Sequence, residues 1–269
     1  MYLLRDLQSG ELSKLRRAVN ASADTDRKMA RKISGLNAAH IERQLTMITL
    51  HHLENSQSIR ILWLLEELEM EYGFKMYDRD TKTMLAPDDY KALSPLGTAP
   101  VITDGDITLA ESNAIIDYIL DKAGPNTLRP SAKDKARAPY LFWFHAAQGS
   151  YQSILTMSFV LSITTAKTPF IIRPLISKVL GMTQNLFIKP RLKAVLDKME
   201  SDLSNDEFLA GDLFTAADIA MGYTLYMADL RGDLGTAYPN TKAYLDRMNA
   251  RPAWKKALAK DGKFQGIPS

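Results

Sequence analysis

Two short segments place polar side chains and backbone groups where they could hold a peptide-like anion. In the first, Leu96–Ile102, Pro100 opens an apolar strand, an unusual position because proline removes a donor from the ladder. Asp104-Gly105 follows and indicates a hairpin between two apolar runs. The second segment, Glu111-Ser112, precedes the helix signal of residues 113–122. Because N–H groups at a helix start attract carboxylates, the two segments together predict a site for a peptide-like, anionic ligand.

The elements that would position these segments alternate between strand and helix. Strands are expected at 48–52, 74–77, 101–103 and 107–109, and helices at 58–70, 87–93 and 113–122. Gly73 is the expected end of the first helix, since helix C-termini favour glycine. The order β-α-β-α-β-β-α is typical of a thioredoxin-like domain with a mixed four-stranded sheet, here over residues 47–127. His51 and His52 lie in the first strand, where only one of them can face the core.

Residues 134–269 predict a second, all-helical domain after a linker at 130–133. Long apolar-periodic segments cover residues 136–165 and 171–203, and prolines at 169, 174 and 190 are expected to break or kink them. The stretch 146–166 carries no charge, but its many hydroxyl and amide groups would be costly in lipid. We therefore expect a buried helix there and no integral membrane association.

Composition excludes several classes of function. The chain has 269 residues, 46% of them hydrophobic, and a net charge of only +3, too small to indicate a nucleic-acid partner. The absence of cysteine excludes disulfides, cysteine metal sites and catalysis by a protein thiol. Four scattered histidines predict no metal site. Without a secretory signal at the start, we expect a cytoplasmic protein.

Residues 1–46 form a basic N-terminal segment that we expect to be poorly ordered. A start codon assigned upstream of Met47 is one explanation, and a transit peptide is another. Asp6, Glu11, Asp24 and Asp26 weigh against a transit peptide, because such peptides are poor in acidic residues. The sequence leaves these alternatives open.

The Ala99-Pro100 and Glu111-Ser112 pairs, together with the two-domain plan, resemble the glutathione transferases. The resemblance runs from about Met47 to the C-terminus. It implies an enzyme that uses glutathione as co-substrate, conjugating its thiolate to apolar electrophiles in detoxification, and a homodimer. Reduction of organic hydroperoxides by the same thiolate is left open.

The resemblance also implies roles for the loop after the first strand. Residues 53–60 contain no tyrosine, which favours the serine-type, theta-like branch found in bacteria and fungi. In that branch the thiol-activating donor lies four residues before an arginine of the first helix, which selects Ser56 with Arg60 as its partner. Asn55 and Ser58 are alternative donors. A purely structural role for Ser56, capping the helix, is the competing interpretation.

By the same resemblance, Thr98, Ala99, Pro100, Glu111 and Ser112 bind glutathione. Ala99-Pro100 matches a pair with a cis peptide bond whose backbone binds the cysteinyl unit like an added strand. Glu111 would pair with the γ-glutamyl ammonium, and Ser112 with its carboxylate. Thr98 departs from the family pattern, because many relatives have lysine there to contact the glycyl carboxylate.

The second domain offers a structural motif and a weaker functional one. Phe214–Ile219 predicts a capping box, with Thr215 at the N-cap and Asp218 at N3, which would set the fold rather than the chemistry. Relatives line their electrophile pocket from the first long helix of this domain, where the chain has Trp143, Phe144, His145, Gln148 and Tyr151. An aromatic stripe at helical spacing is more often core than pocket.

A second function belongs to another class. The same fold can serve as a non-catalytic binding or assembly module, since a fold does not dictate function. Thr98 and Gln148 depart from the family pattern and favour this alternative, whereas Ser56 and the Glu111-Ser112 pair favour the enzyme. Retention on immobilised glutathione would separate the two.

Overall fold

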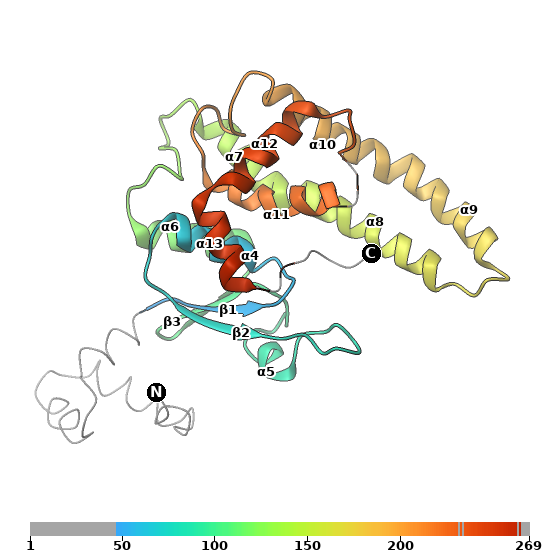
Figure 1. Ribbon diagram of the computed structural model, residues 1–269, viewed down its shortest axis with the longest axis horizontal. Helices are drawn as coiled ribbons and strands as arrows, with labels where there is room; N and C mark the ends of the chain where they lie inside the picture. Colours follow the sequence, from blue (N-terminus) through green and yellow to red (C-terminus); the bar gives the residue numbers. More distant parts are fainter. Residues whose placement is uncertain (1–46, 231, 233, 263, 265–269) are drawn as a thin grey trace, which may run out of the picture.

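A four-stranded mixed sheet forms one part of the molecule, and helices form the rest (Figure 1). The computed structural model describes residues 47–230, 232, 234–262 and 264. The predicted extension 1–46 lies outside the described residues, so its explanation as a transit peptide or as an upstream start codon stays a prediction.

The sheet combines one parallel and two antiparallel pairings. It consists of β1 (Thr49–Leu53), β2 (Gly73–Tyr77), β3 (Val101–Asp104) and β4 (Ile107–Ala110), in the order β2-β1-β3-β4. β1 pairs in parallel with β2 and antiparallel with β3, which pairs antiparallel with β4. With helices α4 (Ile59–Glu67), α5 (Asp88–Lys91) and α6 (Ser112–Ala123), the chain order confirms the thioredoxin-like domain.

The end of the first helix differs from the prediction. α4 ends at Leu68, and Glu69 then adopts a left-handed conformation with φ of 50°. Gly73 does not cap the helix but begins β2 opposite Thr49. A Cβ on Gly73 would lie only 2.6 Å from the Thr49 Oγ1, so glycine is required by the close approach of the two strands.

The remainder of the described chain is helical, as predicted for the second domain. Its elements are α7 (Arg137–Ala146), the π-helix η1 (Ala147–Gln152), α8 (Ser153–Lys167), α9 (Arg173–Thr183), the π-helix η2 (Gln184–Ile188), α10 (Lys189–Asp202), α11 (Ala216–Leu230), α12 (Pro239–Ala250) and α13 (Pro252–Asp261). Pro169 lies between α8 and α9, Pro174 lies in the first turn of α9, where proline costs no hydrogen bond, and Pro190 lies at the start of α10, which follows η2 directly.

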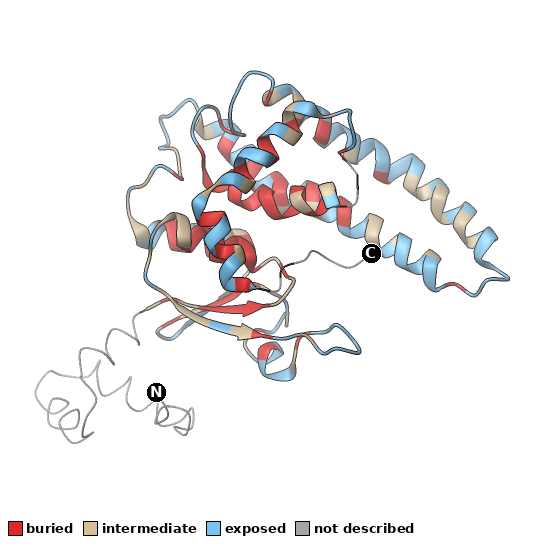
Figure 2. Ribbon diagram, viewed as in Figure 1, coloured by how far each residue is buried: buried red, intermediate tan, exposed pale blue. Residues whose placement is uncertain are grey.

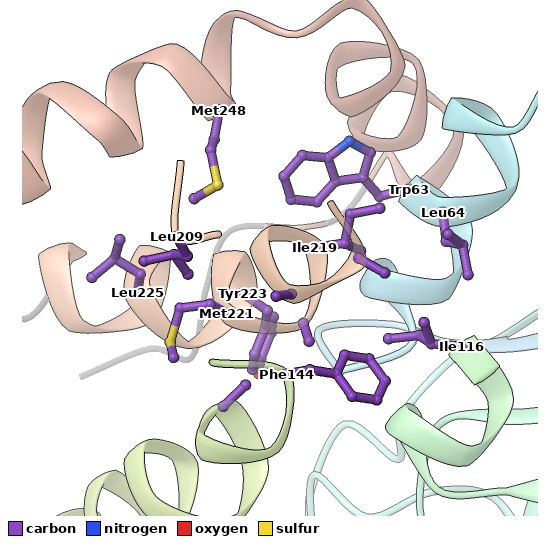
Figure 3. Packing of buried hydrophobic residues seen from close by; sticks show 14 of the residues in the cluster. Trp63, Leu64, Ile116, Phe144, Leu209, Ile219, Met221, Tyr223, Leu225 and Met248 are labelled. Carbon is purple, nitrogen blue, oxygen red and sulfur yellow. The ribbon is translucent and has the colours of Figure 1, made fainter. Parts of the chain in front are cut away.

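Helix α11 is the centre of the main core. It is buried over most of its length, as the red ribbon in Figure 2 shows. Side chains of α4, α6, α7 and α12 meet those of α11 in Figure 3. Gly222 of α11 lies against the Trp63 ring of α4, so the two domains share one continuous core.

The α8–α9 hairpin corrects one expectation. Residues 146–166 were expected to form a buried helix, but α8 buries only Ile154 and Leu155, and α9 buries none of its residues. The two helices run together away from the sheet (Figure 1), so each covers only one side of the other. None of the helices within the described residues combines the length and apolarity needed to cross a bilayer.

The sheet is covered on both faces, and this settles where the two histidines lie. The helices α4, α6 and α13 cover one face, and α5 covers the other with a small cluster that includes Tyr77 and Tyr90 (Figure 1). His52 lies under the α4–α13 layer, and His51 lies on the α5 side against Tyr77. Both are buried, because the second face has a core of its own.

Candidate active site

The register of the sheet brings the predicted binding segments to one end of its strands. His51 of β1 and Ala110 of β4 both lie opposite Val101, the first residue of β3. The C-terminal ends of β1 and β4 therefore lie at the same end of the sheet as the start of β3. The loop after β1, the Ala99-Pro100 pair and the start of α6 meet there, although up to 56 residues separate them in the chain.

The backbone of these segments has two special features. The Ala99-Pro100 peptide bond is cis, as the sequence predicted. Glu111, at the N-cap of α6, has a φ of 74°, which a residue with a side chain rarely adopts. Such an outlier between a strand and a helix is typical of functional sites. It exposes Glu111, while Ser112 is buried at the first position of the helix and Thr98 is exposed.

Ser56 lies in a buried cluster of hydroxyl groups at the start of α4. Its Oγ donates to the Leu53 carbonyl at 2.7 Å, lies 2.7 Å from the Ser58 Oγ, and accepts the Ser58 backbone N–H at 3.2 Å. The last bond is a local turn contact between residues two apart, because the N-cap of α4 is Ser58 and its side chain makes no capping hydrogen bond. The hydroxyl proton itself is directed at a carbonyl, so it can be redirected by a rotation about one bond.

Arg79 binds the same loop from outside, and sequence analysis did not connect it with the site. Its guanidinium donates to the carbonyls of Glu54 at 3.0 Å and Asn55 at 3.3 Å, while its backbone N–H donates to the Glu54 carboxylate. Asn55 adopts a φ of 47°. The guanidinium therefore fixes the conformation of the loop that carries Ser56, from just beyond the end of β2.

Behind Ser56, a chain of hydrogen bonds runs through β1 to the C-terminal helix. The Ser58 Oγ lies 3.0 Å from the His52 Nδ1, and 3.2 Å from the Leu53 carbonyl oxygen. The His52 Nε2 lies 3.0 Å from an Asp261 carboxylate oxygen, and both side chains are fully buried. Sequence analysis offered Ser58 only as an alternative donor and did not connect His52 or Asp261 with the site.

Arg60 does not contact Ser56, in contrast to the partnership that the sequence suggested. The guanidinium, completely buried, donates to Gln57 at 3.1 Å, Gln152 at 3.2 Å and Thr224 at 2.6 Å, and lies 5.0 Å from the centre of the Tyr223 ring. Burial lowers the pKa of Arg60 from 12.5 to about 10, the nearby Tyr223 opposing the shift. Arg60 thus connects α4 with η1 and α11, and acts on the site through Gln57.

The candidate pocket residues of the second domain are divided between surface and core. His145 is exposed, whereas Tyr151, Trp143 and Phe144 are buried in the main core. Gln148 connects with the Ser56 loop, since its Nε2 donates to the Gln57 Oε1 at 2.9 Å, and the Phe144 carbonyl accepts a hydrogen bond from the Asn113 Nδ2 in the first turn of α6 at 2.6 Å. The π-helical turn adds a residue per turn and places both Gln148 and Gln152 toward α4, a common use of π-turns near functional sites.

The predicted capping box is formed and extended. The Asp218 carboxylate accepts hydrogen bonds from the Thr215 N–H at 2.7 Å and hydroxyl at 2.9 Å, as well as from the Leu209 N–H and the Tyr244 hydroxyl. The Thr215 Oγ1 accepts the Ala217 N–H at 3.3 Å. Its role is structural, because it joins three segments of the helical domain. No group of His, Asp and Glu within the described residues could hold a metal ion.

Comparisons with known proteins bear on the whole of this arrangement. The model of the glutathione S-transferase N-terminal domain matches residues 45–121, and that of the C-terminal domain matches residues 187–252. The chain is 34% identical over 215 residues to glutathione S-transferase 3 of Schizosaccharomyces pombe, covering 80% of this chain and 88% of that protein. It is 32% identical over 181 residues to glutathione S-transferase F10 of Arabidopsis thaliana, covering 64% and 78%.

Solved structures show the same fold. A glutathione S-transferase from Actinobacillus pleuropneumoniae matches with a TM-score of 0.64 at 32% identity, over 81% of this chain and 94% of that one. A glutathione transferase from Phanerochaete chrysosporium, crystallised with oxidised glutathione, matches with a TM-score of 0.62 at 21% identity, over 81% and 97%.

A thioredoxin-like domain followed by a helical domain is the class of protein that the fold defines, and both structural neighbours share it. Within that class the two domain models and the yeast relative decide the family. The chain belongs to the glutathione S-transferase family.

Proposed function

We propose that this protein is a serine-type glutathione transferase that transfers the glutathione thiolate to apolar electrophiles. The observation that carries the proposal is the meeting of Ser56, the Ala99-Pro100 pair and the Glu111-Ser112 helix start at one end of the sheet. Family membership supports glutathione as the co-substrate. Peroxide reduction would use the same thiolate and belongs to the same proposal.

The task of the protein is to stabilise the thiolate. A model thiol has a pKa of about 8.5, and lowering it by ~2 units takes about 2.7 kcal/mol of preferential stabilisation. The Ser56 hydroxyl supplies a donor once it turns from the Leu53 carbonyl toward the sulfur. The Ser58 hydroxyl is already engaged with Ser56 and His52. These contacts favour Ser56 over Ser58 as the donor.

The peptide part of glutathione fits this end of the sheet by its charges and backbone. Glu111 is exposed beside the helix start and would pair with the γ-glutamyl ammonium, while Ser112 and the first N–H groups of α6 would take the adjoining carboxylate. The Ala99 backbone would pair with the cysteinyl unit. Thr98, exposed next to it, offers only a neutral hydroxyl to the glycyl carboxylate.

The apolar electrophile and the dimer are parts of the same proposal. Gln148 is the helical-domain residue tied to the Ser56 loop, and we assign it to the edge of the electrophile site. The α8–α9 hairpin exposes large apolar side chains, among them Met157, Val160 and Leu175, and the loop before α5 exposes Met84 and Leu85. An isologous homodimer would cover both, the first domain of one protomer meeting the second domain of its partner.

Two further points complete the proposal. The boundaries are a glutathione-binding domain at residues 47–127 and a helical domain at 134–269. The place of action is the cytoplasm, where glutathione keeps thiols reduced and a protein without cysteine needs no protection of its own.

The test is an absorbance titration of bound glutathione near 240 nm, on the full chain and on Ser56→Ala. The wild type should bind glutathione with a thiol pKa about 2 units below that of the free tripeptide. In Ser56→Ala the pKa of the bound thiol should return most of the way to that of the free tripeptide. A lowered pKa that survives the substitution would refute the role of Ser56. Failure to retain the protein on immobilised glutathione would refute the glutathione site and support the non-catalytic module.

A further inference from the structure

The hydrogen-bond chain behind Ser56 ends in a buried imidazole–carboxylate pair, and a thiol donor alone does not require such a pair. We infer that His52, held by Asp261, accepts the glutathione thiol proton through the hydroxyls of Ser58 and Ser56. The inference rests on the proposed glutathione site and adds to it the destination of the proton. The links measure 2.7 Å from Ser56 Oγ to Ser58 Oγ, 3.0 Å from Ser58 Oγ to His52 Nδ1, and 3.0 Å from His52 Nε2 to Asp261.

The donor and acceptor groups decide the direction of each hydrogen bond between Ser56 and Asp261 before glutathione binds. A neutral imidazole has one donor and one acceptor nitrogen. Asp261 accepts, so His52 donates from Nε2, and its Nδ1 is left to accept the Ser58 hydroxyl proton. The Ser58 Oγ can then accept the Ser56 hydroxyl, once that hydroxyl turns from the Leu53 carbonyl. Every acceptor in this arrangement points away from the site, toward Asp261.

A thiol placed on Ser56 completes the path. The S–H bond breaks and its proton moves to the Ser56 Oγ, the Ser56 proton moves to the Ser58 Oγ, and the Ser58 proton moves to the His52 Nδ1. The sulfur keeps the electron pair. The products are a thiolate that accepts a hydrogen bond from Ser56 and an imidazolium paired with Asp261, so charge and atoms balance without another reactant.

An acidic side chain and the C-terminus of a helix lie beside His52. Asp261 is the last residue of α13, and its side chain is fully buried against the imidazole. An acidic residue at a helix C-terminus is repelled by the partial negative charge of the helix dipole, and that same end stabilises a nearby cation. Among the described residues, Lys260 is a further charged group on this side, and its ammonium lies 5.2 Å from the centre of the Phe74 ring that packs on His52. Lys260 is itself paired with Tyr72 and Glu66.

The direct test follows the protonation state of His52 by nitrogen NMR of the full chain labelled with 15N-histidine at pH 7.5. The four histidines are few enough to assign by substitution. Glutathione should convert the His52 signal from neutral to imidazolium, and S-methylglutathione, which lacks the thiol proton, should leave it neutral. A His52 signal that stays neutral while the 240 nm band shows thiolate would overturn the inference. So would a signal that is imidazolium before glutathione is added.

Variants test the path between the two ends. His52→Asn and Ser58→Ala should each raise the pKa of the bound thiol by about one unit, which lowers the fraction of bound thiolate at pH 6.5 from about one half to about one tenth. His51→Asn is the matched control, since it removes a buried imidazole of the same strand that takes no part in the hydrogen bonds from Ser56 to Asp261. It should leave the thiolate fraction unchanged. Ser58→Ala keeps the His52–Asp261 contact, so it serves if His52→Asn does not fold.

The outcomes separate this inference from the proposed function. An unchanged thiol pKa in both His52→Asn and Ser58→Ala would reduce the His52–Asp261 pair to a structural contact between β1 and α13. If the protein is not retained on immobilised glutathione and no 240 nm band appears, the glutathione site itself fails, and the inference fails with it.

Discussion

Acid destabilises this protein through His51, and the structure gives the size of the effect. The imidazole is 8% exposed between β1 and the α5 cluster. Its Nδ1 lies 2.9 Å from the Tyr77 hydroxyl and its Nε2 lies 3.1 Å from the Thr103 hydroxyl, so the neutral ring is fully paired without a counter-ion. Burial, and then the positive charge of Lys75, lower the pKa of His51 from 6.5 to about 4.

The direction of the pH dependence follows from this lowered pKa. The unfolded chain takes up the proton near pH 6.5, whereas the folded chain resists it until about pH 4. The stabilisation from a neutral His51 is therefore complete above pH 6.5 and is lost progressively as the pH falls to 4. Between pH 7.5 and pH 5.0 the loss comes to at most about 2 kcal/mol, because the partly accessible edge of the ring is screened by solvent.

Urea unfolding of the wild type and of His51→Asn at pH 7.5 and 5.0 measures this loss. Because every other titrating group is common to both proteins, the difference between their pH dependences isolates His51. The wild type should lose about 1–2 kcal/mol more than the variant on acidification. Equal losses, within 0.5 kcal/mol, would show that burial does not exclude the imidazolium and would refute the argument.

Three further substitutions test the packing that supports the site. Gly222→Ala would place a Cβ 2.6 Å from the Trp63 ring and should cost about 1–3 kcal/mol in denaturant unfolding, whereas an unchanged midpoint would show that α4 and α11 can move apart. Asp218→Ala leaves four buried donors without their acceptor and should cost about 3 kcal/mol or more by the same assay, with a loss under 1 kcal/mol contradicting the buried network. Leu85→Asp should shift the proposed dimer to monomer in sedimentation velocity, and an unaltered dimer would exclude this loop from the interface.

The sequence predicted local features well where a single residue type has a specific structural use. The cis bond before Pro100 was implied by the resemblance to the glutathione transferases, whereas the hairpin at Asp104-Gly105 and the capping box of Thr215 and Asp218 follow from the residues themselves, because each depends on neighbours in the chain. Gly73 was misassigned for the same reason. Glycine serves both helix ends and close strand contacts, and only the pairing with Thr49 shows which applies.

The helical domain shows where periodicity is insufficient. The apolar residues of α8 predicted burial, but a two-helix hairpin that projects from the core can cover only one side of each helix. The aromatic stripe of α7 did enter the core, since that helix packs on α11. The same pattern therefore leads to opposite exposure, depending on how many neighbouring helices are available.

The sequence by itself determined the thioredoxin-like and helical parts of the fold through local patterns of turn, cap and periodic residues, and its resemblance to the glutathione transferases supplied the family and the segments proposed to hold glutathione. Only the tertiary structure decided which groups of the site are hydrogen-bonded to each other. In the structure Arg60 donates a hydrogen bond to Thr224 of α11 and not to Ser56. Hydrogen bonds also connect Ser56, through Ser58 and His52, with Asp261, which lies 205 residues further along the chain. Hydrogen bonds of this kind depend on which buried donor meets which acceptor after packing, and no spacing in the chain encodes that distance.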